Sequence, residues 1–142
     1  MTEYAKPLPR ITPENRPFWE AARRHQLALQ RCADCRRFRY PPAPVCPDCL
    51  SEQADWTPVS GRGTVSTYVI VHKRYFASFG NDIPYNVVQV QLDEGPRLTA
   101  NLVGVGKAEI RVGARVEVVF DDVTPDVTLP RFRPLAGGSE RA

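Results

Sequence analysis

The sequence lacks any long run of apolar residues and has few of several chemically useful side chains. Of its 142 residues only 2 are histidines, and glycine occurs 9 times against 14 prolines. No stretch approaches the roughly 20 apolar residues that a membrane-spanning helix needs, and no cleavable targeting segment is recognisable. We therefore expect a soluble, cytoplasmic protein with no membrane partner. The high proline content predicts short strands and many turns.

The common catalytic and nucleotide-binding motifs are also missing. The chain contains no Gly-x-Ser-x-Gly, no phosphate-binding loop and no dinucleotide fingerprint. His25 and His72 stand in no triad or metal-binding pattern. Asp93 and Glu94 are neighbours in a predicted turn, so their carboxylates point apart and make a poor acid–base pair. The sequence names no catalytic residue and argues against catalysis by this chain alone.

The net charge of +3 is unevenly distributed. Residues 1–50 carry nine Lys or Arg against five acids, a balance of +4, whereas residues 51–142 carry ten against eleven, a balance of −1. A basic half of this kind suits nucleic acid, the phosphates of a nucleotide-like cofactor or an acidic partner, or is simply a solvated face. A balance of +4 over fifty residues is weak for a nucleic-acid binder.

All four cysteines lie in two Cys-x-x-Cys hooks with ten residues between them. Cys32 and Cys35 form the first hook, and Cys46 and Cys49 form the second. Each two-residue spacer turns the backbone so that both sulfurs point inward, which lets four thiolates converge on one tetrahedral ion at about 2.3 Å. The spacing favours a zinc ribbon. Two disulfides, a dithiol redox pair and a rubredoxin-type iron centre are the alternatives.

A site made of four protein thiolates has no open coordination position. It cannot activate water or substrate as a catalytic zinc does, and its coordinated thiolates are not free nucleophiles. The predicted Zn²⁺ is therefore structural. Many ribbons place glycine directly after each hook to allow positive φ, whereas this chain has Arg36 and Leu50 there.

The rest of the pattern is typical of a mainly β protein with one N-terminal helix. The segment Thr12-Pro13-Glu14 and Pro17 are helix-start chemistry and predict a helix over 17–24. Leucines at period two predict a strand over 26–30, a return strand follows over 36–40, and 51–60 completes the ribbon. Further strands are predicted over 64–72, 85–92, 97–103, 110–118 with a turn at Gly113, and 128–133, which fits a five-stranded OB-fold barrel.

These elements predict four parts along the chain. Residues 1–25 form an N-terminal arm and helix, and residues 26–60 form a rubredoxin-like zinc ribbon. Residues 61–135 form the OB-fold barrel. Residues 136–142 form a disordered tail.

The order of several short motifs resembles a family that joins a zinc ribbon to an OB fold. That family was long catalogued as a domain of unknown function and is found beside thiolase-type enzymes. The resemblance spans about residues 12–134. Its motifs are Pro17-Phe18-Trp19, the two hooks with Pro41-Pro42 between them, Gly61-Arg62-Gly63-Thr64, Pro84-Tyr85, Leu92-Asp93-Glu94-Gly95, Gly113 and Pro130-Arg131-Phe132.

The resemblance implies an accessory subunit. Members of the family look like partners of thiolase-fold proteins, including acyl-CoA thiolases, aldolases that shorten steroid side chains, and hydroxymethylglutaryl-CoA synthase. They help to bind the acyl-CoA or shape its channel, while the carbon–carbon chemistry stays with the thiolase-fold subunit. The sequence departs from the family pattern at Arg36, where members often have Gly, and at Ala43, where many have Arg.

The strongest candidate binding segment runs from residue 73 to residue 84, between two predicted barrel strands. It combines two cations, three aromatics and a glycine in a connection of about a dozen residues, the kind of long loop that commonly binds. Its cations suit CoA phosphates and its aromatics suit a partner or an acyl channel, although a packed loop over the barrel mouth is the alternative. The candidate acyl-CoA-binding or partner-binding residues are Phe18, Trp19, Arg37, Arg39, Lys73, Arg74, Tyr75, Phe76, Phe79 and Tyr85. For Phe18 and Trp19 the alternative is docking of the helix onto the ribbon or the barrel.

Two functions from different classes follow. The favoured one is a non-catalytic, zinc-stabilised subunit that associates with a thiolase-fold enzyme and helps to bind or channel acyl-CoA. The alternative is a single-stranded nucleic-acid-binding protein, because zinc ribbons and OB barrels both occur in that role. The net negative charge of the barrel half argues against the alternative.

Overall fold

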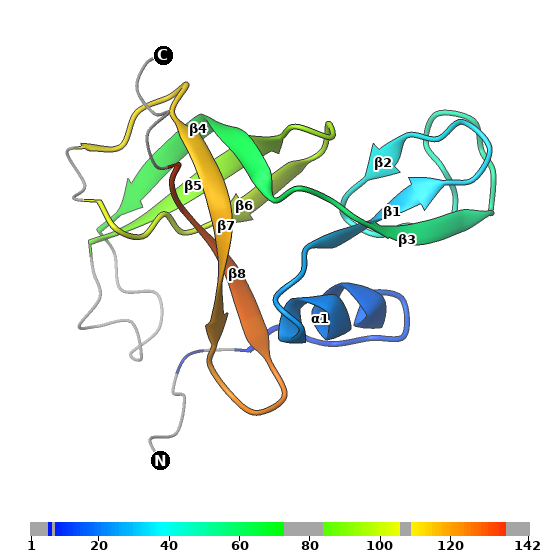
Figure 1. The fold of residues 1–142 in the computed structure, drawn as a ribbon, viewed down its shortest axis with the longest axis horizontal. Helices are drawn as coiled ribbons and strands as arrows, with labels where there is room; N and C mark the ends of the chain where they lie inside the picture. The colour runs from blue at the N-terminus through cyan, green and yellow to red at the C-terminus, as the bar shows by residue number, and fades with distance from the viewer. Residues whose placement is uncertain (1–5, 7, 73–83, 106–108, 136–142) are drawn as a thin grey trace.

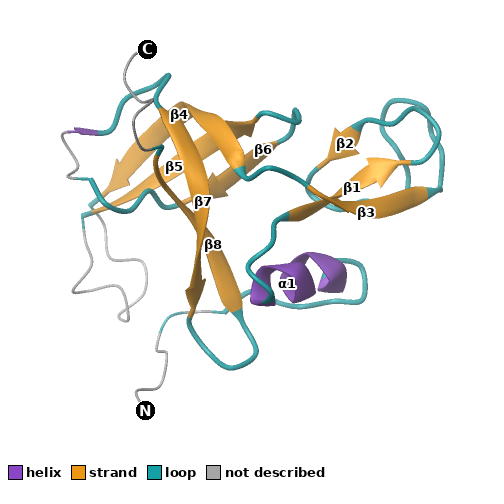
Figure 2. Ribbon diagram, viewed as in Figure 1, coloured by secondary structure: helices purple, strands orange, loops and turns teal. Residues whose placement is uncertain are grey.

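One helix and two antiparallel sheets make up the fold in the computed structural model, which describes residues 6, 8–72, 84–105 and 109–135 (Figures 1 and 2). The smaller sheet has the strand order β2-β1-β3 and the larger one β6-β5-β4-β7-β8. The elements are α1 (Arg16–Arg23), β1 (Ala28–Cys32), β2 (Phe38–Arg39), β3 (Ala54–Pro58), β4 (Arg62–Val71), β5 (Tyr85–Leu92), β6 (Arg97–Ala100), β7 (Arg115–Asp122) and β8 (Thr128–Pro134).

Helix α1 starts within one residue of its predicted position. The backbone N–H of Thr12 donates to Asn15 Oδ1 at 2.7 Å, and Pro17 stands in the first turn, where its missing N–H has no helical partner to lose. Phe18 and two alanines form the buried face, which packs against β1 and β8. The helix therefore touches both sheets, as Figure 1 shows.

The ribbon sheet is shorter than the sequence pattern predicts. The first strand runs over Ala28–Cys32 rather than 26–30, and the return strand predicted over 36–40 is reduced to Phe38–Arg39. The physical reason is the first hook: the N–H of Cys32 donates to the carbonyl of Arg37 at 2.9 Å. Because of this bond, residues 36 and 37 belong to the turn of the hook and not to the return strand.

The larger sheet curls into the predicted OB-fold barrel. Strand β4 pairs with both β5 and β7, so the edge strands β6 and β8 curl towards each other. An isolated parallel bridge joins Leu102, just after β6, to Phe132 of β8. The N–H of Val103 donates to the Phe132 carbonyl at 2.7 Å, and the N–H of Phe132 donates to the Asn101 carbonyl at 3.0 Å. These bonds close the barrel between its edge strands.

The predicted strand over 110–118 is wrong at its start. Strand β7 begins only at Arg115 and runs on to Asp122. Gly113, at a φ of 94°, turns the chain there, and its N–H donates to the carbonyl of Val65 at 2.8 Å. Ile110 precedes this turn and is buried in the barrel core, so its hydrophobicity reflects packing outside a strand.

The link between the sheets is tight enough to require a glycine. Gly61 has a φ of 79°, and a Cβ there would lie 2.4 Å from Cγ1 of Val118. Its carbonyl accepts from the N–H of Val118 at 2.7 Å, and the N–H of Val59 donates to the carbonyl of Leu27 at 2.8 Å. The buried core continues across the link and consists of Phe18, Leu27, Leu29, Val65, Val88, Val90, Leu92, Leu98, Leu102, Ile110, Val116 and Phe132.

Candidate metal centre

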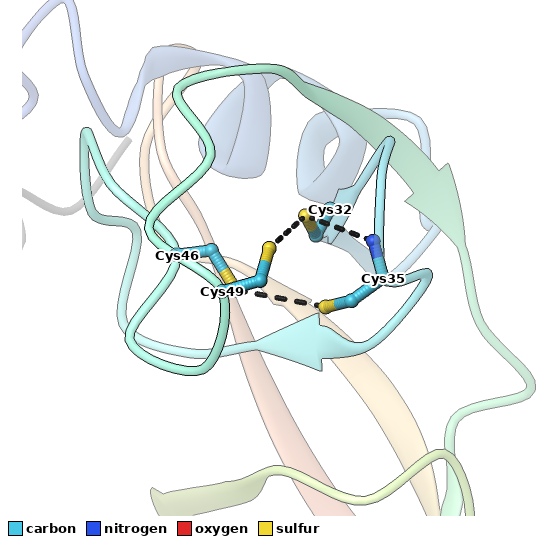
Figure 3. Close-up of side chains that lie close together, drawn as sticks. All are labelled: Cys32, Cys35, Cys46 and Cys49. Carbon is cyan, nitrogen blue, oxygen red and sulfur yellow. Dashed lines mark hydrogen bonds between the residues drawn. The ribbon is translucent and has the colours of Figure 1, made fainter.

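Two loops of the ribbon bring all four cysteine sulfurs together (Figure 3). Cys32 ends β1, Cys35 follows in the β1–β2 turn, and Cys46 and Cys49 lie between β2 and β3. The Sγ atoms lie within 4.8 Å of one another, with 3.5 Å between Cys32 and Cys49 and 3.7 Å between Cys35 and Cys46. A regular tetrahedron with metal–sulfur bonds of about 2.3 Å requires sulfur–sulfur separations of about 3.8 Å. The donor set therefore fits a tetrahedral thiolate-bound ion.

The two hooks fold in the same way although their sequences differ. In each, the carbonyl of the first cysteine accepts from the N–H four residues on, at 3.0 Å for Cys32 and Arg36 and at 2.9 Å for Cys46 and Leu50. The N–H of the first cysteine donates to the carbonyl five residues on, at 2.9 Å in both hooks. These bonds pin the loops on either side of the sulfurs.

The residue after each hook has the left-handed backbone conformation that many ribbons assign to glycine. Arg36 has a φ of 72° and Leu50 a φ of 66°. Such a conformation costs a non-glycine residue about 1–2 kcal/mol. The backbone of each hook is therefore locally strained, and the bonds that the hook makes must offset the cost of that strain.

In each hook the first cysteine has a lowered pKa before any cation binds. The N–H groups of Cys35 and then Asp34 donate to the Cys32 sulfur and lower the pKa of Cys32 to about 6. The N–H groups of Cys49 and then Asp48 lower the pKa of Cys46 in the same way. The thiolate of Cys32 is therefore favoured near neutral pH, and the ionised form of Cys46 is favoured in the same direction.

The second cysteine of each hook responds in the opposite direction. A backbone N–H two residues further on lowers its pKa, but burial and the neighbouring sulfurs outweigh that bond. The pKa of Cys35 is raised, and that of Cys49 rises to about 12. Two protons must leave these thiols when a divalent ion takes up all four sulfurs, so metal loading becomes less favourable as pH falls.

The two arginines predicted to bind a ligand have different surroundings. Arg37 is exposed and pairs with Asp48 at 3.4 Å. Arg39 is 9% exposed; its Nε donates to Gln30 Oε1 at 2.9 Å, and its Nη2 donates to the carbonyl of Ala43 at 2.8 Å. This differs from the expectation of a surface contact, because Arg39 ties β2 to β1 and to the loop after it. Its Nη1 is buried without a partner among the described residues.

The aromatic pair on α1 also divides into an inner and an outer residue. Phe18 is 3% exposed and contacts Trp19 and Tyr40, with ring centroids 5.0 and 5.4 Å away. Its burial leaves no surface for a ligand, so docking of the helix accounts for it. Trp19 is half-buried and lines a groove of 160 Å³ together with Ile11, Arg16, Glu20, Arg23 and Asp126.

Tyr85 opens β5 opposite Val71 of β4 and is half-buried. The other predicted binding residues, Lys73, Arg74, Tyr75, Phe76 and Phe79, lie outside the described residues, as does the tail 136–142.

Sequence reasoning missed a polar cluster between the helix and the barrel. His25 Nε2 lies 3.0 and 3.1 Å from the two carboxylate oxygens of Asp122, and its ring stacks on Phe120 at 5.3 Å. The Thr128 hydroxyl donates to Asp122, and this bond and then His25 hold the pKa of Asp122 below its usual value. No sequence signal could have found the pair, since 97 residues separate its members.

Asp93, one of the two neighbouring acids that make a poor acid–base pair, forms an ion pair with Arg115. Arg115 donates from both Nη atoms to Asp93, at 2.7 and 2.8 Å, and holds the pKa of that carboxyl below its usual value. Glu94 instead accepts from the N–H of Ser60 at 2.8 Å. The two neighbouring carboxylates thus serve separate structural contacts.

Within the described part of the chain, the four cysteines form the one group of three or more His, Cys, Asp or Glu side chains spaced to hold a metal. No helix there has the length and apolar character to cross a membrane.

Comparison with known proteins assigns this architecture to a family. Residues 19–54 match the rubredoxin-like zinc ribbon domain of ChsH2, and residues 56–121 match its C-terminal OB-fold domain. A DUF35 domain-containing scaffold protein of Pyrococcus furiosus is 39% identical, and the match covers 83% of this chain and 90% of that protein. The chain belongs to the DUF35 family. The predicted zinc ribbon, its structural Zn²⁺ and the OB fold are thereby confirmed.

Two further relatives of this DUF35 chain have descriptions that name enzymes. A solved chain described as "Ltp2-ChsH2(DUF35) aldolase" is 39% identical, with a TM-score of 0.82, and the match covers 89% of this chain and 98% of that one. A Thermomonospora curvata protein described as "Probable enoyl-CoA hydratase alpha subunit" is 40% identical over 95% of this chain. The chain spans 42% of the length of that subunit.

Proposed function

We propose that this DUF35 chain is a non-catalytic subunit that associates with a thiolase-fold enzyme and helps to bind or channel its acyl-CoA. The observation that carries the proposal is the similarity to the "Ltp2-ChsH2(DUF35) aldolase" chain over 98% of that chain's length. That description pairs a DUF35 protein with an aldolase. The family resemblance of the sequence implies that such partners have the thiolase fold.

The chemistry of the described residues supports a subunit that leaves the reaction to its partner. Four thiolates fill the coordination sphere of a tetrahedral ion, so the metal has no position for substrate. His25 is hydrogen-bonded to Asp122, and Asp93 is paired with Arg115, so these groups serve structural contacts. Carbon–carbon bond chemistry therefore falls to the partner's active site.

The acyl-CoA part of the proposal rests on charge and on a relative's name. The guanidinium of Arg31 is half-buried, lies 4.9 Å from the centre of the Phe38 ring and donates to the carbonyl of Arg36. Arg37 is 69% exposed and pairs with Asp48. Guanidinium groups at this end of the ribbon suit a phosphate-bearing nucleotide such as CoA. The Thermomonospora relative is named for an enoyl-CoA substrate.

That relative also favours a second candidate partner. It is named as a hydratase subunit and is more than twice as long as this chain, so a DUF35 unit also occurs within proteins of that description. A hydratase in place of the thiolase-fold enzyme is the second candidate. Both share the same substrate class, a CoA thioester.

The deciding experiment is purification of the tagged full-length chain from its source cells, with zinc analysis and mass spectrometry of the proteins that elute. We expect about one zinc per chain and a thiolase-fold protein in a fixed ratio. The complex should then re-form from the two recombinant subunits and bind an acyl-CoA more tightly than the partner alone. Capture of a hydratase instead selects the second candidate.

A salt titration tests the nucleic-acid alternative in the same preparation. Binding of a single-stranded oligonucleotide that weakens steeply with added salt, without any enzyme partner, contradicts the proposal. Chain cleavage of an acyl-CoA by this subunit alone also contradicts it.

A further inference from the structure

The C-terminal half of β4 has an unpaired edge. Strand β5 pairs with β4 as far as Val71, but β7 pairs only with Arg62–Thr64. The last contact on the β7 side is Val65, which exchanges backbone bonds with Gly113 and Ala114 at 2.8 and 3.0 Å. Among the described residues, no strand pairs with that side of β4 from residue 66 to residue 71. In Figure 1 this end of β4 lies beside β5 and away from β7.

The outward face beside this edge is apolar. Val69 stands opposite Val87, and Val71 stands opposite Tyr85, in cross-strand pairs of β4 and β5. The intervening Tyr68 and Ile70 pack against the core, so the paired residues face outward. Val69 is 56% exposed. We call the edge of residues 66–71, with the outward side chains Val69, Val71, Tyr85 and Val87, the β4 edge patch.

The edge differs in chemistry from the other sheet edges. Residues 66–71 read Ser-Thr-Tyr-Val-Ile-Val, without a charge or a proline. Uncharged β-forming edges invite pairing with another chain, and proteins usually blunt them with charges or prolines. The other edge strands carry such residues: Arg39 in β2, Asp55 and Pro58 in β3, Arg97 in β6, and Pro130, Arg131 and Arg133 in β8.

We infer that the β4 edge patch is the docking surface for the enzyme subunit, an extended segment of which adds a strand to β4. The inference rests on the proposed function. Strand addition supplies backbone hydrogen bonds to the edge, and the patch supplies apolar contacts for alternate side chains of the added strand. Because the patch is uncharged, the partner's segment is uncharged and apolar on the facing side. The solved DUF35 relative is described together with an aldolase, which selects an enzyme subunit over a second copy of this chain.

The test compares two valine-to-lysine substitutions in the full-length chain. Val69→Lys places a charge in the patch, and Val45→Lys is the matched control, because Val45 is 37% exposed and lies in the ribbon outside any strand. The probe is the recombinant thiolase-fold subunit identified by co-purification. We expect Val69→Lys to weaken binding on the order of a hundredfold, since the interface would bury an unpaired ammonium group. Val45→Lys should bind like wild type, and both variants should keep zinc and the wild-type melting temperature.

Hydrogen exchange of the complex gives an independent readout. Strand addition should slow exchange of amides within residues 66–71 when the subunit binds. Equal binding by both variants with no added protection would overturn the inference and leave the proposed function standing. Failure of the wild-type chain to bind any thiolase-fold subunit would overturn both. A wild-type dimer that Val69→Lys converts to a monomer, with enzyme binding unchanged, would assign the patch to a second copy and also overturn the inference.

Discussion

The ribbon and the barrel are two β structures that stabilise themselves in different ways. Between residues 30 and 58 the buried side chains are Cys32, Arg39 and Cys46, and the aromatic side chains there are only partly buried against the shared core. The barrel instead encloses a layer of aliphatic residues around Phe132, which is fully buried. The outer ribbon therefore depends mainly on its metal, whereas the barrel depends on the hydrophobic effect. Each region should fail when its own source of stability is removed.

The largest expected effect is loss of the ribbon when a thiolate is removed. Cys46→Ser should reduce zinc from about one per chain to nearly none, because ligand loss removes binding free energy that is also folding free energy, on the order of 10 kcal/mol in zinc-finger peptides. Hydrogen exchange should rise across β1, β2 and β3 and stay slow in β5. Ala33→Ser, an exposed change inside the first hook, is the control. Full metal and unchanged melting in Cys46→Ser would contradict the ribbon assignment.

The reciprocal change should damage the barrel and spare the metal. Phe132→Ala removes a fully buried ring and should lower the free energy of unfolding by about 3–5 kcal/mol. Denaturant unfolding measures this loss, and Val112→Ala, on an exposed side chain, should cost little. Zinc content at low denaturant should remain at one per chain. Loss of zinc together with barrel structure would show that the two regions unfold as one unit.

A smaller effect is expected at the cluster that joins helix and barrel. The folded-state pKa of Asp122 lies below its ordinary value of 3.8, because Thr128 and then His25 favour the ionised form. Its contribution to stability is therefore present above pH 4 and is lost as pH falls through the folded-state pKa. Asp122→Asn should melt slightly below wild type at pH 6, and the difference should shrink as the pH falls below 4. Asp126→Asn is the control, and a melting difference that does not change with pH would rule out a charge effect.

The smallest effect is a gain in the ribbon. Leu50 has a φ of 66° and is 74% exposed, so replacing it by glycine relieves strain and loses little packing. Leu50→Gly should raise the free energy of unfolding of the zinc-loaded protein by about 0.5–1 kcal/mol. Val45→Gly, in the same loop without positive φ, should lower it. A loss of stability in Leu50→Gly would mean that the leucine packs in a way its exposure does not indicate.

Much of the fold was predictable because its signals are local. The spacing of the hooks alone predicts the metal centre. The alternating valines of β5 predict both ends of the strand Tyr85–Leu92 correctly. The errors fall where a turn or a backbone bond overrides a pattern of residue types. The return strand begins only at Phe38, because the N–H of Cys32 bonds the carbonyl of Arg37 within the hook. The turn expected at Gly113 is present, but the strand begins only after it, at Arg115.

The candidate binding residues were less predictable than the metal site. Arg39 looks like a surface group in the sequence, yet it bridges two segments of the ribbon. Phe18 could either dock the helix or bind a partner, and in the structure it lies on the buried face of α1. A side chain's type shows what it can bind, but its burial depends on segments far along the chain. The β4 edge patch also has no sequence signature, because an unpaired edge exists only once the position of β7 is known.

The sequence by itself determined the four-thiolate donor set, its closed coordination and the mainly β character, since ligand spacing and residue alternation are properties of short segments. The tertiary structure decided which charged side chains pair with one another within the chain and which sheet edge stays unpaired. His25 bonds Asp122, 97 residues further along the chain, and the backbone bonds between β4 and the β7 side end at Val65. Both depend on how the barrel closes, and closure is set by contacts between distant strands that no local pattern encodes.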